Sequence, residues 1–167
     1  MTETTGTKTR RILFLDFDGV LSSDRYLKRR RESEGEGYLE AARLETLRRI
    51  VDETGAEIVL STSWREHWDP DGGNECWKEK FAGDLQRFGI EIVDRTPEIK
   101  PWDRAGEVGA WLEAHREEVF SFVILDDQTF RGWKDLTDRF VKTAGYRGGI
   151  TEAEADRAIE LLKTPLA

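Results

Sequence analysis

Two aspartates, Asp16 and Asp18, follow a short apolar run and stand directly before a glycine. The run, Ile12 to Leu15, has the composition of a buried strand, so the carboxylates are pushed toward a low-dielectric interior. A chain keeps such a costly pair when a cation or a reaction uses it. Strand side chains alternate between faces unless the strand ends between them, and Gly19 allows a sharp turn there. This arrangement suits one carboxylate attacking a phosphorus atom while the next, on the loop, handles a proton.

Two further apolar runs also end in polar residues. Ile58 to Leu60 is followed by three hydroxyl side chains, Ser61-Thr62-Ser63, and Phe120 to Leu125 is followed by Asp126 and Asp127. Each group alone could be a helix cap or a turn. In open α/β sheets, however, the functional crevice lies outside the carboxyl ends of the strands. Three strand ends that all carry polar groups therefore predict a site at one edge of a sheet.

The elements that must position these groups alternate along the chain. Short apolar runs bounded by turn residues predict strands over 11–17, 57–61, 90–93, 120–125 and 140–143. Helical periodicity and capping residues predict helices over 39–54, 77–88, 103–118 and 151–163. The segment 22–37 is predicted to be a polar loop or flap, with the basic run 28–31 as a candidate grip on a polyanion. Alternation of this kind predicts an α/β fold, a three-layer, Rossmann-like open parallel sheet. We expect a flexible tail over 1–10 and a single domain over 11–167.

Composition limits the classes of function. The 167 residues carry a formal net charge of −8, which argues against broad attraction to nucleic acid or an anionic membrane but leaves room for a local basic patch. Cys76 is the single cysteine, so the chain has no disulfide framework. No apolar run approaches a membrane span, and the first residues lack an apolar signal core. We expect a cytoplasmic protein with no membrane association and no obligate protein partner.

Three segments resemble the phosphatase branch of the haloacid dehalogenase (HAD) superfamily: ILFLDFDGVL at 12–21, IVLSTSWR at 58–65 and VILDD at 123–127. The Ser-Trp-Arg ending of the second segment resembles the HAD domains of RNA-repair proteins and of polynucleotide 3′-phosphatases. The resemblance implies a Mg²⁺-dependent, two-step phosphoryl transfer. Asp16 would attack phosphorus and form an aspartyl-phosphate. Asp18 would protonate the leaving group and then activate water.

The resemblance also implies roles for the remaining polar residues. Mg²⁺ would be held by Asp16, by Asp126 or Asp127, and by the main-chain carbonyl of Asp18, a set of hard oxygen ligands. Thr62 or Ser63, ahead of Ser61, would hydrogen-bond a phosphoryl oxygen. Either Lys100 or Arg104 would supply the cation that neutralises the nucleophile and the phosphoryl group. Gly19 and Arg65 are expected to contact the substrate.

The spacing of the motifs leaves little room for the cap domain that large members of the superfamily carry. The segments 22–52 and 66–99 are each too short for a folded cap, so we expect a capless or minimally capped enzyme whose open site admits the end of a large substrate. The leading substrate is a nucleic-acid 3′-phosphate end, ahead of nucleotides and small phosphorylated metabolites. Two other classes are a non-catalytic binding module of the same fold and a response-regulator-like receiver. The receiver fits poorly, because its adjacent acidic pair would end the first strand.

Overall fold

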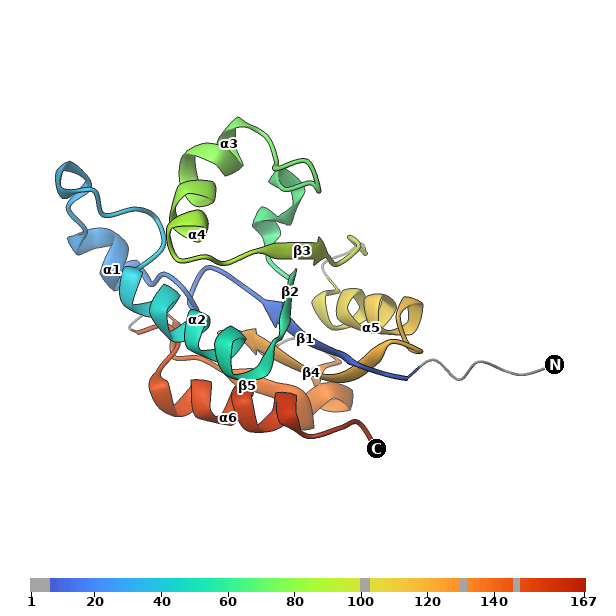
Figure 1. The fold of residues 1–167 in the computed structure, drawn as a ribbon. Helices are drawn as coiled ribbons and strands as arrows, with labels where there is room; N and C mark the ends of the chain where they lie inside the picture. Colours follow the sequence, from blue (N-terminus) through green and yellow to red (C-terminus); the bar gives the residue numbers. More distant parts are fainter. Residues whose placement is uncertain (1–6, 100–102, 130–131, 146–147) are drawn as a thin grey trace.

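Five parallel strands form a single open sheet in the computed structural model, which describes residues 7–99, 103–129, 132–145 and 148–167 (Figure 1). The strands are β1 (Arg10–Leu15), β2 (Glu57–Leu60), β3 (Ile92–Arg95), β4 (Val119–Asp126) and β5 (Phe140–Lys142). Their order is β3-β2-β1-β4-β5, and every neighbouring pair is parallel. The predicted open parallel α/β sheet is therefore confirmed.

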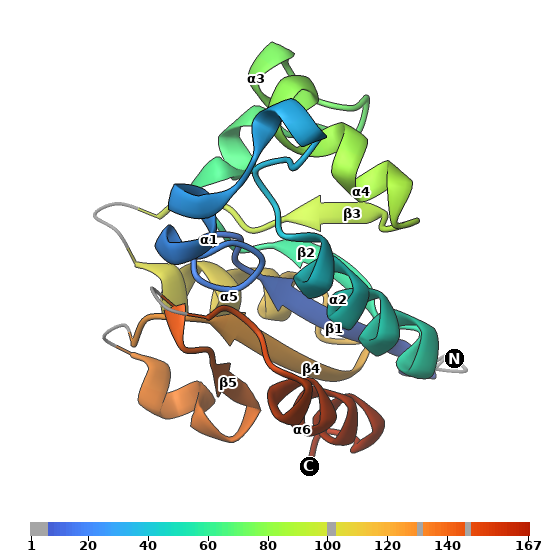
Figure 2. The same cartoon turned by 90° about the vertical axis from the view of Figure 1, so that its left-hand side faces the viewer.

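Helices cover both faces of the sheet (Figures 1 and 2). The α-helices are α1 (Asp24–Arg29), α2 (Ala41–Thr54), α3 (Glu75–Trp77), α4 (Gly83–Arg87), α5 (Arg104–Ala114) and α6 (Glu152–Lys163). The described ranges also contain the 3₁₀ segments η1 (Glu32–Glu34), η2 (Ser63–His67) and η4 (Trp133–Arg139) and the π segment η3 (Lys78–Ala82). Helices α2 and α6 lie on one face, and α5 lies on the other.

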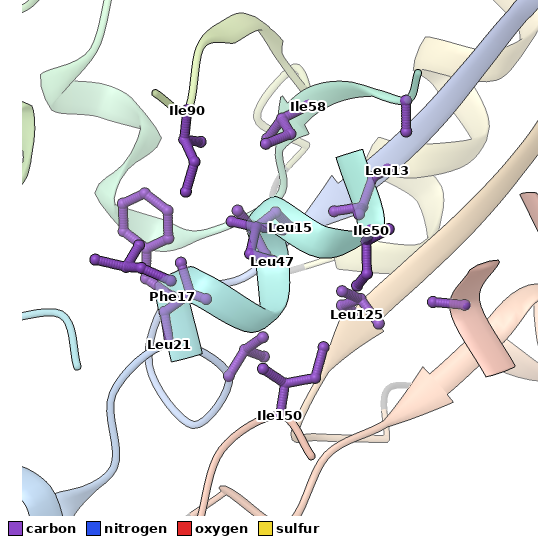
Figure 3. Close-up of a cluster of buried hydrophobic side chains, with 14 of the residues drawn as sticks. Leu13, Leu15, Phe17, Leu21, Leu47, Ile50, Ile58, Ile90, Leu125 and Ile150 are labelled. Carbon is purple, nitrogen blue, oxygen red and sulfur yellow. The ribbon is translucent and has the colours of Figure 1, made fainter. Parts of the chain in front are cut away.

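The central strand β1 divides the core between these two layers. Its alternate residues Leu13 and Leu15 join the larger cluster with α2 and α6 (Figure 3), while Ile12 and Phe14 pack with α5. All four side chains are fully buried. Because both faces of the strand are covered, its sequence is continuously apolar rather than alternating.

Several predicted boundaries were wrong. Strand β1 ends at Leu15, two residues earlier than predicted, so Asp16 already belongs to the following turn. The predicted polar loop over 22–37 contains α1, capped by Ser23, and η1. Strand β3 spans Ile92–Arg95, so both of its ends lie two residues later than predicted, and helix α5 ends at Ala114, four residues earlier than predicted. Edge strands and helix ends are specified weakly by local patterns, and these differences leave the layers unchanged.

The segment between β2 and β3 packs on the main core. Trp77, Phe81 and Leu85 of the α3–η3–α4 stretch belong to the same hydrophobic cluster as Leu15 and Phe17. This stretch therefore extends the domain and has no core of its own among the described residues. No helix in the described ranges is long and apolar enough to cross a membrane.

Candidate active site

The carboxyl ends of β1 and β4 lie side by side at the point where the strand order reverses. The chain leaves β1 to form β2 on one side, whereas β4 pairs with β1 on the other. Such a switch point opens a crevice at the carboxyl edge of the sheet. Asp16 follows β1, and Asp126 and Asp127 stand at the end of β4.

A tight turn presents Asp16. The amide of Leu21 donates to the carbonyl of Phe17 at 2.8 Å, and Gly19 has a φ of +84° that an L side chain rarely adopts. The Asp16 carboxylate accepts a hydrogen bond from the amide of Phe17 at 2.9 Å. The turn therefore fixes the first aspartate while it carries the second, Asp18, onto the loop.

Three carboxylates converge at this edge. One oxygen each from Asp16, Asp126 and Asp127 lies within 4.8 Å of the other two. Asp16 and Asp126 are only 6% and 1% exposed, so their charges are not screened by bulk water. The predicted meeting of these distant acidic residues is thus present in the fold.

The surroundings of this cluster disfavour the charged forms of Asp16 and Asp127. Burial and then repulsion by Asp126 raise the pKa of Asp16 well above its ordinary value, against the opposing charge of Arg104 and a hydrogen bond from the Thr62 side chain. Burial, followed by repulsion from Asp126, raises the pKa of Asp127 to about 6. Both shifts arise first from burial and then from the negative charge of a neighbouring carboxylate.

Arg104 supplies the one cation that the described salt bridges place in the cluster. One of its terminal nitrogens lies 3.0 Å from Asp126 and 3.5 Å from Asp16. Arg104 is the first residue of α5, and Asp103 caps that helix by accepting from the amide of Gly106 at 2.9 Å, as predicted. Of the two basic candidates, Arg104 therefore reaches the carboxylates, and Lys100 lies outside the described residues.

The three hydroxyl side chains after β2 take different positions. Thr62 is fully buried, contacts Asp16 and begins η2 as its capping residue. Ser63 is exposed on η2. The Ser61 hydroxyl is buried without a hydrogen-bond partner among the described residues. The structure thus brings Thr62, and not Ser63, to the predicted nucleophile.

The donor set fits a divalent cation. Three carboxylates face one arginine in the described ion pairs, and hard oxygen ligands are those that Mg²⁺ and Ca²⁺ prefer. One Asp127 oxygen is buried with no partner among the described groups. A Cβ added to either Gly19 or Gly145 would collide with the Asp127 carboxyl group, so two glycines form a cradle around it. The Asp127 oxygen and the cradle together fit an ion in this place.

Arg65 lies in a buried ion pair. One terminal nitrogen donates to the Thr62 carbonyl at 3.1 Å, and the other pairs with Glu107 of α5. The two side chains are 12% and 5% exposed. Arg65 therefore fastens the loop that carries Thr62 to α5, and a contact between Arg65 and substrate stays a prediction.

The basic run over 28–31 does not form an open patch of positive charge. Arg29, Arg30 and Arg31 each pair with a glutamate, at 3.1, 2.6 and 3.2 Å respectively. Local ion pairs of this kind are what a solvated helix end with many glutamates provides. These ion pairs weaken the prediction that the run 28–31 binds a polyanion.

Sequence reasoning missed four contributors to the site. Tyr38 donates to one Asp18 oxygen at 2.7 Å, and Trp64 donates to the other at 2.8 Å. The Thr143 hydroxyl donates to the carbonyl of Gly19 at 2.7 Å, and Glu107 holds Arg65. In the sequence, Trp64 belongs to the Ser-Trp-Arg ending that carries the family resemblance. The other three lie far from the motifs in sequence, and no local pattern marks them.

The open parallel sheet, the Asp-x-Asp turn after β1 and the acidic pair at the end of β4 are together the arrangement of the HAD superfamily. A family model described as the HAD domain in Swiss Army Knife RNA repair proteins matches residues 12–155, and the chain belongs to this family. Comparisons with curated proteins and with solved structures gave no significant match. The predicted resemblance to HAD domains of RNA-repair proteins is thereby confirmed.

Proposed function

We propose that this protein is a Mg²⁺-dependent phosphomonoester hydrolase that works through an aspartyl-phosphate on Asp16. The observation that carries the proposal is the convergence of Asp16, Asp126 and Asp127 with Arg104 and Thr62 at one sheet edge. Asp16 and one or both of Asp126 and Asp127 would hold the ion. When bound, Mg²⁺ would supply positive charge to a phosphoryl oxygen and to the carboxylates around it.

In the first step an Asp16 carboxylate oxygen attacks phosphorus. A bond forms between this oxygen and phosphorus, and the bond from phosphorus to the leaving oxygen breaks. Protonated Asp18 gives its proton to that leaving oxygen, so the product leaves as a neutral alcohol. Arg104 and the Thr62 hydroxyl stabilise the negative charge of the phosphoryl group in transit.

In the second step water attacks the phosphorus of the aspartyl-phosphate. Asp18, now a carboxylate, takes one proton from the water. The bond from phosphorus to the Asp16 oxygen breaks, inorganic phosphate leaves, and Asp16 and Asp18 return to their starting states as a carboxylate and a protonated acid respectively. One aspartate thus serves as acid and then as base, which the loop position of Asp18 beside Asp16 supports.

The substrate class is proposed to be a nucleic-acid 3′-phosphate end. Membership of a family named for RNA repair proteins and a core without a separate cap among the described residues both support a large substrate that presents one end. The test compares phosphate release, with Mg²⁺, from a 3′-phosphorylated oligonucleotide, its 5′-phosphorylated counterpart, a nucleoside monophosphate and a sugar phosphate. The 3′-phosphorylated strand should show the highest kcat/KM. A preference for the nucleotide or the sugar phosphate would assign a metabolite phosphatase, and no release from any of them would assign a binding module.

Mg²⁺ is expected to stabilise the protein, and the effect should depend on pH. In the metal-free fold Asp127 keeps its proton up to a pH of about 6, whereas the unfolded chain loses it near 3.8. The metal-free protein therefore loses stability as the pH rises from about 4 to about 6. Protons compete with the ion over the same window, so binding strengthens as the pH rises through 6. At an Mg²⁺ concentration of about 100 times Kd, the gain is about 2.7 kcal/mol.

The measurement is the thermal midpoint with Mg²⁺ and with EDTA, from pH 4.5 to pH 8. The matched variants are Asp127→Asn and Asp71→Asn, the latter at an exposed position in the loop before α3. Asp71→Asn should retain the full Mg²⁺-dependent rise, and Asp127→Asn should lose most of it. An equal rise at every pH, or in both variants, would rule out this cluster as the metal site.

A further inference from the structure

Both oxygens of the Asp18 carboxylate are held by donors from distant segments. The Tyr38 hydroxyl, just ahead of α2, donates to one oxygen at 2.7 Å. The Trp64 indole, on η2, donates to the other at 2.8 Å. Asp18 itself lies half-buried in the turn after β1, and the hydrogen bonds described for its carboxylate come from these two donors. Two charge-assisted donors on opposite oxygens fix the plane of this group.

The two donors are themselves held in a packed aromatic cluster. The rings of Tyr38 and Trp64 meet edge to face, with centroids 5.7 Å apart. Each also packs on Phe81, at 5.5 and 5.2 Å, and Phe81 is fully buried. Their positions are therefore set by the core, and the hydrogen bonds transmit that order to Asp18.

The cluster also keeps Tyr38 a donor. Burial, together with the hydrogen bond to Asp18, raises the pKa of Tyr38 above its ordinary value, so the hydroxyl keeps its proton throughout the neutral range. The Lys80 ammonium lies 5.0 Å from the centre of the Tyr38 ring and 5.3 Å from that of Trp64, which covers the cluster with a cation. Each carboxylate oxygen has a second lone pair, so Asp18 can still carry and release a proton while both donors stay in place.

We propose that Tyr38 and Trp64 are positioning residues that hold Asp18 in the orientation needed to transfer a proton to the leaving group. The inference rests on the proposed phosphatase function and adds the segment between α1 and α2 to its machinery. General acid catalysis matters most when the leaving group is a poor one. Loss of the positioning should therefore be felt by alkyl phosphates, whose alcohol needs the proton, more than by p-nitrophenyl phosphate, whose phenolate leaves without it.

The experiment measures kcat/KM, which reports the step up to transfer onto Asp16, for glycerol 2-phosphate and for p-nitrophenyl phosphate. Tyr38→Phe and Trp64→Phe are each expected to lower kcat/KM for glycerol 2-phosphate by about 10-fold and kcat/KM for p-nitrophenyl phosphate by less than about 3-fold. These losses are part of the rate enhancement that general acid catalysis supplies. Asp18→Asn sets the upper limit, with an alkyl loss of about 100-fold or more. The ratio between the two substrates is a readout that a purely structural role would not move.

Two matched variants serve as controls. Trp111→Phe removes an indole-to-carboxylate hydrogen bond of the same 2.8 Å length, made to Asp94. Tyr26→Phe removes a hydroxyl that donates to the carbonyl of Gly37, next to Tyr38 in the same segment. Both should leave the alkyl-to-aryl ratio unchanged. Tyr38→Phe deletes a single oxygen, so it carries the test if Trp64→Phe fails to fold.

Equal losses on the two substrates in Tyr38→Phe would overturn the inference and leave the proposed function standing. The same would follow if Tyr26→Phe changed the ratio as strongly as Tyr38→Phe, since the effect would then come from loosening of the segment. Absence of hydrolysis of both esters and of the 3′-phosphorylated oligonucleotide by the unaltered protein would overturn the proposed function and the inference with it.

Discussion

Replacing Asp16 with asparagine is expected to abolish phosphomonoester hydrolysis, with a loss of at least about 1,000-fold in kcat. The amide is close in shape to the carboxyl group but cannot attack phosphorus. The same change should not destabilise the metal-free protein at neutral pH. Burial and repulsion from Asp126 already disfavour the charge on Asp16 in the fold, so a neutral isostere removes that strain. Phosphate release and the thermal midpoint in EDTA are the two measurements.

Asp71→Asn is the matched control for Asp16→Asn, because it makes the same chemical change at an exposed position. It should leave both the activity and the thermal midpoint unchanged. Retention of more than a tenth of the activity by Asp16→Asn would exclude Asp16 as the nucleophile. An unfolded Asp16→Asn protein would show that the carboxylate is needed for the fold, contrary to the strain argument.

Replacing Arg65 with methionine is expected to lower the free energy of unfolding by about 3–5 kcal/mol. In this variant Glu107, which is 4% exposed, becomes a buried charge without its arginine partner. Its carboxylate keeps the hydrogen bond from the amide of Ile99 at 3.0 Å. The loss should appear as a lower urea midpoint with an unchanged slope. Arg65→Met with Glu107→Leu should recover most of the loss, because a buried pair replaced by apolar side chains leaves no unpaired charge.

The control for Arg65 is an exposed ion pair of the same type. Arg31 and Glu34 lie 3.2 Å apart with side chains 71% and 59% exposed, so Arg31→Met should cost less than about 1 kcal/mol. A similar, small cost for Arg65→Met would show that this pair is not effectively buried. A large loss of substrate affinity at normal stability would restore Arg65 to the substrate-contact role that the sequence predicts.

The central part of the fold could be predicted because its signals are local and strong. Runs such as Ile12 to Leu15 are apolar on both faces, which is the mark of a strand covered on both sides, and they alternate with helix patterns. The helices predicted over 103–118 and 151–163 do start at capping residues, Asp103 and Thr151. The predicted ends of the strands and helices were less accurate. The helix α1 within the predicted loop is short and capped by Ser23, a signal that the surrounding polar residues hide.

By itself the sequence determined which acidic residues would meet. Asp16, Asp126 and Asp127 each follow an apolar strand, and parallel strands bring their carboxyl ends to one edge whatever the details of packing. Only the tertiary structure showed that Thr62 rather than Ser63 contacts Asp16, that Arg104 reaches the carboxylates, and that Arg65 pairs with Glu107. It also brought Tyr38 and Trp64 to Asp18. The approximate place of each strand along the chain follows from a short-range apolar pattern, whereas the direction of a side chain on a loop depends on the contacts that distant segments make with it.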